Sequence, residues 1–327
     1  MDRRIDFGVS LYSFTQPWYE RPGYGIADMF AFLRKLGISQ YEIVGAQSFD
    51  QYPVPRPETV RGLLELNERY GMTPFSYGGG VDMGKITGRD MDDEEIFRES
   101  LNDLRVAQRI GAKHLRGTML PLDYLPRLAE FAERFGIRIG FEIHAPSRPS
   151  DAKIQQYLEA FDKLDSPWLG FVPDFGIFIE RPSPTLKENL ERRGAHRETV
   201  EHAIANRHVG KTEEQVWQEV QAMGHAGEGD HIAVSQLFGH QSFGPADFDG
   251  FRSVLRRTLY FHGKFYHVDE NLVETAIDYD RLLGLVVESG FRGTMMTEYE
   301  GHSYNLDDAE EQVARHIAMQ ESILSKL

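Results

Sequence analysis

The stretch ERFGIRIGFEIH at residues 133–144 contains the unit from which the chain is built. It starts in an amphipathic helical pattern, Gly136 stops that helix, and the apolar run that follows is typical of a buried strand. Glycine suits the helix end because it adopts the left-handed backbone conformation without a steric cost. The strand ends on two chemically active side chains, Glu142 and His144.

The same unit recurs along the chain. The other junctions are RKLGISQYEIVG (34–45), ERYGMTPFSYGG (68–79), QRIGAKHLRGTM (108–119) and VESGFRGTMMTEY (287–299). Serial helix–glycine–strand units predict strands that alternate with helices, and therefore a parallel sheet. We expect strands near residues 5–12, 40–45, 72–78, 114–119, 137–143, 168–173, 263–268 and 293–298. We expect helices near residues 26–36, 57–70, 92–110, 121–135, 151–164, 278–289 and 307–325.

Eight strands with this alternation favour a closed (β/α)8 TIM barrel over an open doubly wound sheet. The length of 327 residues fits such a barrel as a single domain over residues 1–327. A dinucleotide-binding fold is disfavoured because SLYSFTQPWYE (10–20), which follows the first strand, lacks the glycine-rich fingerprint.

The repeat is interrupted once, between strands six and seven, where residues 180–260 contain helical patterns instead of one crossover helix. This insertion is too apolar and too patterned to be a linker. It is either a helical elaboration packed on the barrel, or a lid or subunit-docking element. In both cases it starts at the carboxyl end of a strand, where barrels carry their active sites.

Composition limits the classes of function. The net charge is -15, from 51 acidic against 36 basic residues, and such a chain repels phosphate backbones, so we expect no nucleic-acid partner. The chain has no cysteine, which excludes disulfides, thiolate zinc sites and a cysteine nucleophile. No run reaches the length of a membrane span and no cleavage signal stands at the start, so we expect a cytoplasmic protein without membrane contact.

Four of the expected strands end on an acid or a histidine: Glu142, Asp174, His267 and Glu298. Parallel strands bring their carboxyl ends to one rim of a barrel. Burying three carboxylates without a cation is unfavourable, and three oxygen donors with one imidazole nitrogen suit a divalent ion. The pattern predicts a site for Mn²⁺ or Mg²⁺, with Zn²⁺ or Co²⁺ less favoured. The competing interpretation is structural ion pairing.

Residues two apart on a strand share a face. We therefore expect His144 to point to the same side as Glu142, and Glu300 to the same side as Glu298. His144 is the expected general base because imidazole titrates near neutrality, unless it only orients a metal ligand. Glu142 and Glu298 are the other expected catalytic groups, and Glu300 is expected to bind substrate.

Aromatic residues cluster in the loops of the same rim. Trp18 lies in the proline-bounded loop TQPWYERPG (15–23), and Phe178 follows the sixth strand. We expect both rings to bind substrate, since aromatic rings stack on sugars and on aromatic ligands. Ordinary packing under loops is the competing interpretation for each of them.

With Glu142, Asp174, His267 and Glu298 in this order, the chain resembles the xylose isomerase-like barrel superfamily of sugar isomerases and epimerases. The resemblance implies one divalent metal held by these four residues. TEYEG (297–301) is similar to the last metal strand of that superfamily. VPDFG (172–176) is similar to its Asp strand but lacks the usual nearby histidine, which speaks against a simple epimerase.

Within that superfamily, EIHAPS (142–147), GFVPDFGIF (170–178) and the insertion most resemble the large (alpha) subunit of bacterial C-glycoside deglycosidases. The resemblance implies 3-oxo-glucosides of aromatic compounds as substrates, manganese or magnesium as cofactor and a small beta subunit as partner. It also implies a mechanism: with the ketone held at the metal, His144 removes the C2 proton and the aromatic aglycone is expelled from C1 by β-elimination.

Three alternatives stay open. The first is a keto-sugar isomerase or epimerase, or an inosose-type dehydratase, in which Glu142 and Glu298 bind metal and also carry protons. The second is a zinc-dependent DNA-repair endonuclease, which the acidic balance disfavours. The third is a non-catalytic sugar-sensing or assembly subunit, which a complete ligand set disfavours. The sequence leaves open the aglycone, the sugar, the native metal, and whether the oligomer is hetero- or homomeric.

Overall fold

Eight parallel strands form the centre of the protein. The computed structural model describes residues 5–207, 209–240 and 245–327. The strands are β1 (Ile5–Ser10), β2 (Gln40–Val44), β3 (Thr73–Gly78), β4 (His114–Gly117), β5 (Arg138–Ile143), β6 (Leu169–Pro173), β7 (Phe261–Phe265) and β8 (Gly293–Tyr299). Each paired strand runs parallel to its neighbour, as the repeated helix–glycine–strand unit predicts.

The sheet is a nearly closed barrel. Hydrogen-bonded neighbours follow the order β6-β5-β4-β3-β2-β1-β8-β7. The two ends of this order, β6 and β7, meet through isolated parallel bridges that join Phe171 to Thr258 and Asp174 to His262. The prediction of a (β/α)8 TIM barrel is therefore confirmed, and the second bridge brings two polar residues side by side.

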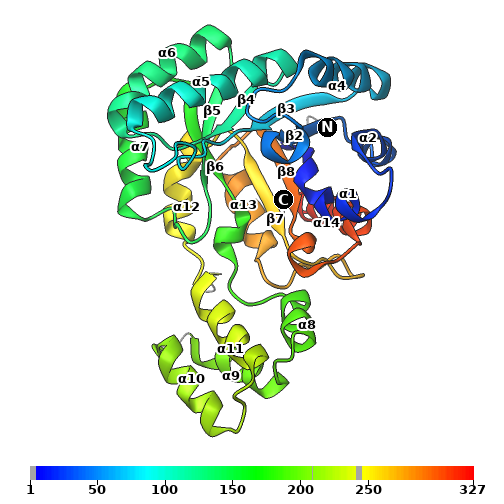
Figure 1. The fold of residues 1–327 in the computed structure, drawn as a ribbon, viewed down its shortest axis with the longest axis vertical. Coiled ribbons are helices and arrows are strands. Elements are labelled where there is room, and N and C mark those ends of the chain that lie inside the picture. The colour runs from blue at the N-terminus through cyan, green and yellow to red at the C-terminus, as the bar shows by residue number, and fades with distance from the viewer. Residues whose placement is uncertain (1–4, 208, 241–244) are drawn as a thin grey trace.

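Helices surround the sheet (Figure 1). They are α1 (Thr15–Glu20), α2 (Ile26–Lys35), α3 (Gly45–Ser48), α4 (Pro57–Tyr70), α5 (Asp93–Ile110), α6 (Leu125–Phe135), α7 (Ala152–Leu164), α8 (Pro184–Arg192), α9 (Arg197–Arg207), α10 (Glu213–Ala222), α11 (Glu228–Ser235), α12 (Phe248–Val254), α13 (Tyr279–Glu288) and α14 (Ala309–Leu324). Short 3-10 turns lie at Leu11–Phe14, Leu122–Tyr124, Phe175–Phe178, Leu255–Arg257 and Gly301–Tyr304, and a π turn at Gln236–His240. Within the described ranges, no helix combines the length and apolar character needed to cross a lipid bilayer.

Glycine ends the helices as expected. α6 stops at Gly136, whose φ of 65° lies in the left-handed region, and its amide donates back to Glu133 O and Ala132 O. Gly111 ends α5 in the same way, with φ of 86°. These two turns start β5 and β4 at the bottom of the barrel, so the strand ends that follow gather at the opposite rim.

Apolar side chains fill the space between helices and sheet, and a second small apolar group fills the barrel interior. The interior group consists of Val172, Tyr260 and Met296, all fully buried. Each lies two residues before one of the polar residues that form the site below, so it sits one layer beneath that residue. The site therefore has an apolar floor, which weakens water's screening of charges above it.

The connection between β6 and β7 contains helices α8 to α12. α12 packs on the barrel, where the ring of Phe251 lies 6.1 Å from that of Phe175 and 5.9 Å from that of Phe261. Helices α8 to α11 contact one another and form a group that extends away from the barrel in Figure 1, while α8 contacts the Gly301–Tyr304 turn after β8. We call α8–α11 the outer helical group.

Candidate metal centre

Four polar side chains from four neighbouring strands converge at the carboxyl end of the barrel. They are Glu142 on β5, Asp174 directly after β6, His262 on β7 and Glu298 on β8. One donor atom of each lies within 4.8 Å of the donor atoms of the others. The structure therefore brings together the three carboxylates expected from the sequence, with a histidine that the sequence analysis did not select.

His267, which we expected as the fourth ligand, lies outside this cluster. β7 begins at Phe261, two residues before the expected start, so its inward positions are His262 and Lys264. His267 lies beyond the end of β7 and faces α14, where its Nδ1 lies 3.4 Å from Nε2 of Gln312. The residue beside the three carboxylates is therefore His262, and not His267 as we expected.

His262 has the hydrogen-bonding pattern of a metal ligand. Its Nε2 lies 3.2 Å from Oε2 of the buried Glu42, which can only accept, so Nε2 carries the hydrogen. Its Nδ1 faces Oε1 of Glu142 at 2.9 Å and Oε2 of Glu298 at 3.2 Å. Ligating histidines commonly donate their second ring N–H to a carboxylate, which fixes the tautomer and orients the ring. Glu42 is placed to give that support to a bound ion.

Three buried polar atoms at the centre have charged neighbours but no hydrogen bond of good geometry. Within the described residues, Asp174 Oδ2, His262 Nδ1 and Glu298 Oε2 are buried and form no hydrogen bond of acceptable geometry. Unsatisfied buried polar atoms are rare in native proteins and require an explanation. These three belong to three of the four converging side chains, so the donor set fits a bound cation.

The charge balance leads to the same conclusion. Five carboxylates gather here: Glu42, Glu142, Asp174, Glu298 and Glu300. Within the described residues, the fixed cations in contact with them are Arg116 and Lys264, so three negative charges remain in excess when His262 is neutral. A divalent cation would neutralise most of that excess and reduce the cost of burying the carboxylates.

The groups strongly perturb one another's protonation. Burial alone would raise the pKa of Glu298, but His262 and Lys264 outweigh it and hold that pKa well below its usual range. Burial raises the pKa of Asp174 even though Lys264 opposes the rise. Burial would lower the pKa of His262, yet the nearby carboxylates, led by Glu298, raise it well above its usual range. Such shifts are typical of functional sites.

Lys264 is a second residue that the sequence analysis missed. Its buried ammonium Nζ lies 2.8 Å from Asp174 Oδ2, 3.3 Å from Glu298 Oε2 and 2.9 Å from Glu300 Oε1. It also lies 3.1 Å from Nε2 of His144. Lys264 therefore links the carboxylate cluster to the expected base.

His144 lies at the edge of the cluster, with its side chain about half exposed. Its Nδ1 lies 2.7 Å from the carbonyl oxygen of Ala145, which only accepts, so Nδ1 carries the hydrogen. Nε2 then holds the lone pair that accepts from Lys264, and it lies 3.7 Å from Asp174 Oδ2. In this tautomer the nitrogen that carries the lone pair faces the four converging side chains.

Arg116 on β4 and Glu42 on β2 complete the polar layer. Arg116 Nη1 donates to Glu142 Oε2 at 2.9 Å, and its Nε lies 3.6 Å from Glu42 Oε1. Glu42 also accepts from the Tyr260 hydroxyl at 3.0 Å. Both residues stand in the middle of expected strands. A charged residue at an inward strand position was the signal that could have revealed them.

The expected substrate-binding residues differ in their surroundings. Glu300 lies in the site, where it contacts Lys264 and accepts a hydrogen bond from Tyr12 at 3.3 Å. Trp18 is partly buried on α1 and lines a small cavity with Leu11, Thr15, Tyr19, Gln47 and Ser48. Phe178 is fully buried, with its ring 4.8 Å from that of Phe251 and 5.9 Å from that of Phe248. The expectation that Phe178 stacks on substrate is corrected, because its ring is enclosed by other aromatic rings.

The sequence matches the model of the xylose isomerase-like TIM barrel family over residues 30–323. The chain belongs to this family. The match extends over most of the barrel and over all four converging residues. The family assignment expected from the strand-end acids is therefore confirmed.

The chain is similar in sequence to curated alpha subunits of deglycosidases. The chain is 29% identical over 327 residues to the 3'-dehydrocarminate deglycosidase alpha subunit of Microbacterium sp, with 94% of this chain and 92% of that protein covered. It is 29% identical over 306 residues to a C-glycoside deglycosidase alpha subunit of Arthrobacter globiformis, with 92% and 86% covered. The relatives are enzyme subunits, which supports an enzyme here as well.

Solved structures share the fold at low identity. An IOLI protein with a bound zinc atom superposes with a TM-score of 0.58 and 13% identity over 98% of this chain and 99% of that one. An L-ribulose 3-epimerase superposes with a TM-score of 0.54 and 11% identity over 98% and 96%. At these identities the structures establish the barrel fold alone.

Proposed function

We propose that this protein is the alpha subunit of a metal-dependent lyase that cleaves the C-glycosidic bond of 3-oxo-glucosides and releases the aromatic aglycone. The observation that carries the proposal is the position of His144, whose basic Nε2 faces the centre formed by Glu142, Asp174, His262 and Glu298. The names of the curated relatives support the same reaction class.

The proposed cofactor is a divalent cation held by those four converging residues. Three oxygen donors and one nitrogen favour Mn²⁺ or Mg²⁺ over Zn²⁺ or Co²⁺. A bound cation would polarise the ketone and hydroxyl oxygens of the sugar. The buried atoms Asp174 Oδ2, His262 Nδ1 and Glu298 Oε2, which form no hydrogen bond of good geometry, support this assignment.

His144 is the proposed base. Its Nε2 accepts the proton at C2, which is acidic because C2 is adjacent to the C3 ketone. The electron pair of the C2–H bond first forms an enolate. When the enolate collapses, the ketone is restored, the C1–C2 double bond forms and the C1–aryl bond breaks. The aryl carbon takes the bond's electron pair together with the proton that His144 accepted from C2, so His144 is regenerated. Lys264, which touches both His144 and Glu300, supplies positive charge where negative charge develops.

The substrate and partner follow from the same proposal. Glu300, at the edge of the centre, is proposed to accept a sugar hydroxyl, and Trp18 to contact the conjugate. A small beta subunit is the proposed partner, since the relatives are named alpha subunits. Residues 180–260 are then a lid or the surface that docks this partner, because they are rooted at the carboxyl end of β6.

The test is turnover of a 3-oxo flavone C-glucoside with Mn²⁺, with and without a co-expressed small partner. We expect release of free aglycone, which chelation abolishes and which His144→Ala reduces by about 100-fold or more, the range of general base catalysis. Metal content measured on the same His144→Ala protein should remain at the wild-type level. If aglycone is released at the wild-type rate by His144→Ala, the assigned base is wrong.

A second candidate is a keto-sugar isomerase or epimerase, or an inosose-type dehydratase, at the same centre. It is favoured by the presence of two carboxylates in the centre, Glu142 and Glu298, whose oxygens lie 2.9 and 3.2 Å from one His262 nitrogen. Those carboxylates would exchange protons with the substrate, and His144→Ala would keep much of the activity. Entry of solvent deuterium into the sugar without aglycone release would select this candidate.

A further inference from the structure

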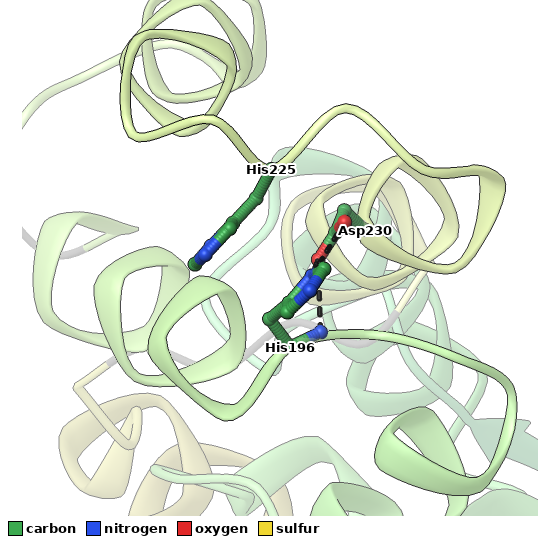
Figure 2. Close-up of side chains that lie close together, drawn as sticks. All are labelled: His196, His225 and Asp230. Carbon is green, nitrogen blue, oxygen red and sulfur yellow. Dashed lines mark hydrogen bonds and ion pairs between the residues drawn. The ribbon is translucent and has the colours of Figure 1, made fainter.

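Outside the barrel, two histidines and an aspartate meet within the outer helical group (Figure 2). His196 lies directly before α9, His225 between α10 and α11, and Asp230 in the first turn of α11. One potential donor atom of each lies within 4.8 Å of those of the other two. The proposed lyase reaction uses none of these residues.

Asp230 is held as a buried anion. Its Oδ1 accepts from the His196 amide at 2.9 Å, and its Oδ2 accepts from the Gly227 amide at 3.2 Å. Burial opposes its ionisation, but the amides and the side chains of Thr199 and His196 outweigh burial and lower its pKa. Within the described residues, no lysine or arginine pairs with Asp230, so its charge is balanced only from the imidazole side.

The imidazoles are arranged beside this anion. His196 Nδ1 lies 3.1 Å from Oδ1 and 3.0 Å from Oδ2 of Asp230. The rings of His196 and His225 are parallel within 7°, with centroids 4.0 Å apart, and His225 Nδ1 lies 3.2 Å from Thr199 Oγ1. Donors bound tetrahedrally to one zinc ion at about 2.0–2.2 Å lie about 3.3–3.6 Å apart, so the hydrogen-bonded atoms of His196 and Asp230 need to separate by only a few tenths of an ångström to share an ion.

We propose that His196, His225 and Asp230 bind a zinc ion that ties the start of α9 to the turn between α10 and α11. Two imidazole nitrogens and one carboxylate oxygen form a donor set that zinc accepts in proteins. The half-exposed side chain of His196 gives the ion a path from solvent and leaves a coordination position open.

The outer helical group also has a physical need for such a crosslink. Its buried side chains are mostly small, among them Val200, Ala203, Val216, Val220 and Ala233. A small apolar core contributes little stability, and such units often rely on metals or disulfides. The chain has no cysteine, so a histidine–aspartate site is the form of crosslink available to this group.

The experiment is a zinc titration of chelator-stripped protein in competition with a chromophoric chelator. The Glu298→Gln variant, which lacks a donor of the barrel centre, should retain one zinc equivalent. The double variant Glu298→Gln/His225→Asn should lose it, because His225 contributes only its side chain there. Hydrogen exchange of Glu298→Gln should show that zinc slows exchange in α9 and α11, and this slowing should be absent in the double variant.

The matched control is Glu298→Gln/His231→Asn. His231 lies next to Asp230 on α11, but its ring contacts Trp217 instead of the cluster, so this variant should keep the zinc equivalent. If Glu298→Gln does not fold, wild type and His225→Asn are compared, and the variant should bind one equivalent fewer. Folded Glu298→Gln that binds no zinc, or a zinc equivalent that survives in Glu298→Gln/His225→Asn, would overturn the proposal. In the wild-type comparison, equal numbers of zinc equivalents in wild type and His225→Asn would overturn it. The metal site proposed for the barrel centre does not depend on either outcome.

Discussion

At the scale of single residues, the inward-facing positions of β7 decide which histidine belongs to the centre. His262 and Lys264 alternate with the outward rings of Phe261 and Phe265, both fully buried against the helices. His267 follows the end of the strand and faces α14. Side chains on a strand alternate between its faces, so the early start of β7 turns His262 inward, and the chain has left the strand before it reaches His267.

The different positions of His262 and His267 lead to a paired prediction about Mn²⁺ binding. His262→Gln should weaken Mn²⁺ binding by at least about 100-fold, because even outer partners of metal ligands cost about 10–100-fold when they are removed. His267→Gln should leave Mn²⁺ binding close to that of the wild type. Titration with Mn²⁺, followed by electron paramagnetic resonance of the free ion, measures both. Equal losses in the two variants would contradict the assignment of His262.

A second prediction at this scale concerns pH. Burial raises the pKa of Asp103 to about 7, against the opposing hydrogen bond from the Gly80 amide. The folded protein therefore keeps a proton that the unfolded chain releases above about pH 4, so Asp103 lowers the free energy of unfolding as pH rises from about 4 to 7. Above about pH 7 the contribution of Asp103 to the free energy of unfolding no longer changes with pH.

Asp103→Asn should accordingly stabilise the protein at pH 8 and have little effect near pH 4.5. Urea unfolding at the two pH values measures the difference. Glu274, whose pKa burial also raises to about 7, should preserve part of the pH dependence in the variant. A stability change that is equal at both pH values would argue that Asp103 does not titrate in this window.

At the scale of elements, the outer helical group depends on a close contact between α11 and the turn before α9. A Cβ atom on Gly229 would lie 2.3 Å from the backbone carbon of Gly194 and 2.6 Å from Arg193 O. Backbone cannot yield as a flexible side chain does. Gly229→Ala should therefore separate these segments, at a cost of about 1–3 kcal/mol.

Hydrogen exchange measures this effect by element. In Gly229→Ala, amides of α9 and α11 should exchange faster, while those of the barrel strands stay unchanged. Gly284→Ala on α13 is the control, since a Cβ there meets no atom within 4 Å, and it should stabilise its helix by about 0.5–1 kcal/mol. A uniform change across the chain in Gly229→Ala would show that the outer group does not open independently.

At the scale of the whole molecule, a cation at the centre would join strands β5 to β8, including the β6–β7 junction, where two bridges replace a continuous ladder. Mn²⁺ at about 100 times its dissociation constant should stabilise the fold by about 2.7 kcal/mol. The melting temperature should rise by a few degrees on adding Mn²⁺ and fall on chelation. Glu298→Gln should remove this response, and a response that persists would place the ion elsewhere.

The order of strands and helices could be derived from the residues because its signals are local. Helical periodicity, glycine at helix ends and short apolar runs all act over about ten residues, and they predicted the eight strands within two residues at the start of each. Glu142, Asp174 and Glu298 could be selected for the same reason, since each stands at the end of an apolar run.

Tertiary structure alone decided the remainder of the site. The start of β7 depends on its pairing with β8, so the choice of His262 over His267 was invisible in the local pattern. Lys264 and Arg116 became site residues through contacts with carboxylates on other strands, and the packing of α12 enclosed Phe178. Contacts between distant residues depend on register and packing of the whole chain, whereas periodicity reports only which face of its own element a residue occupies.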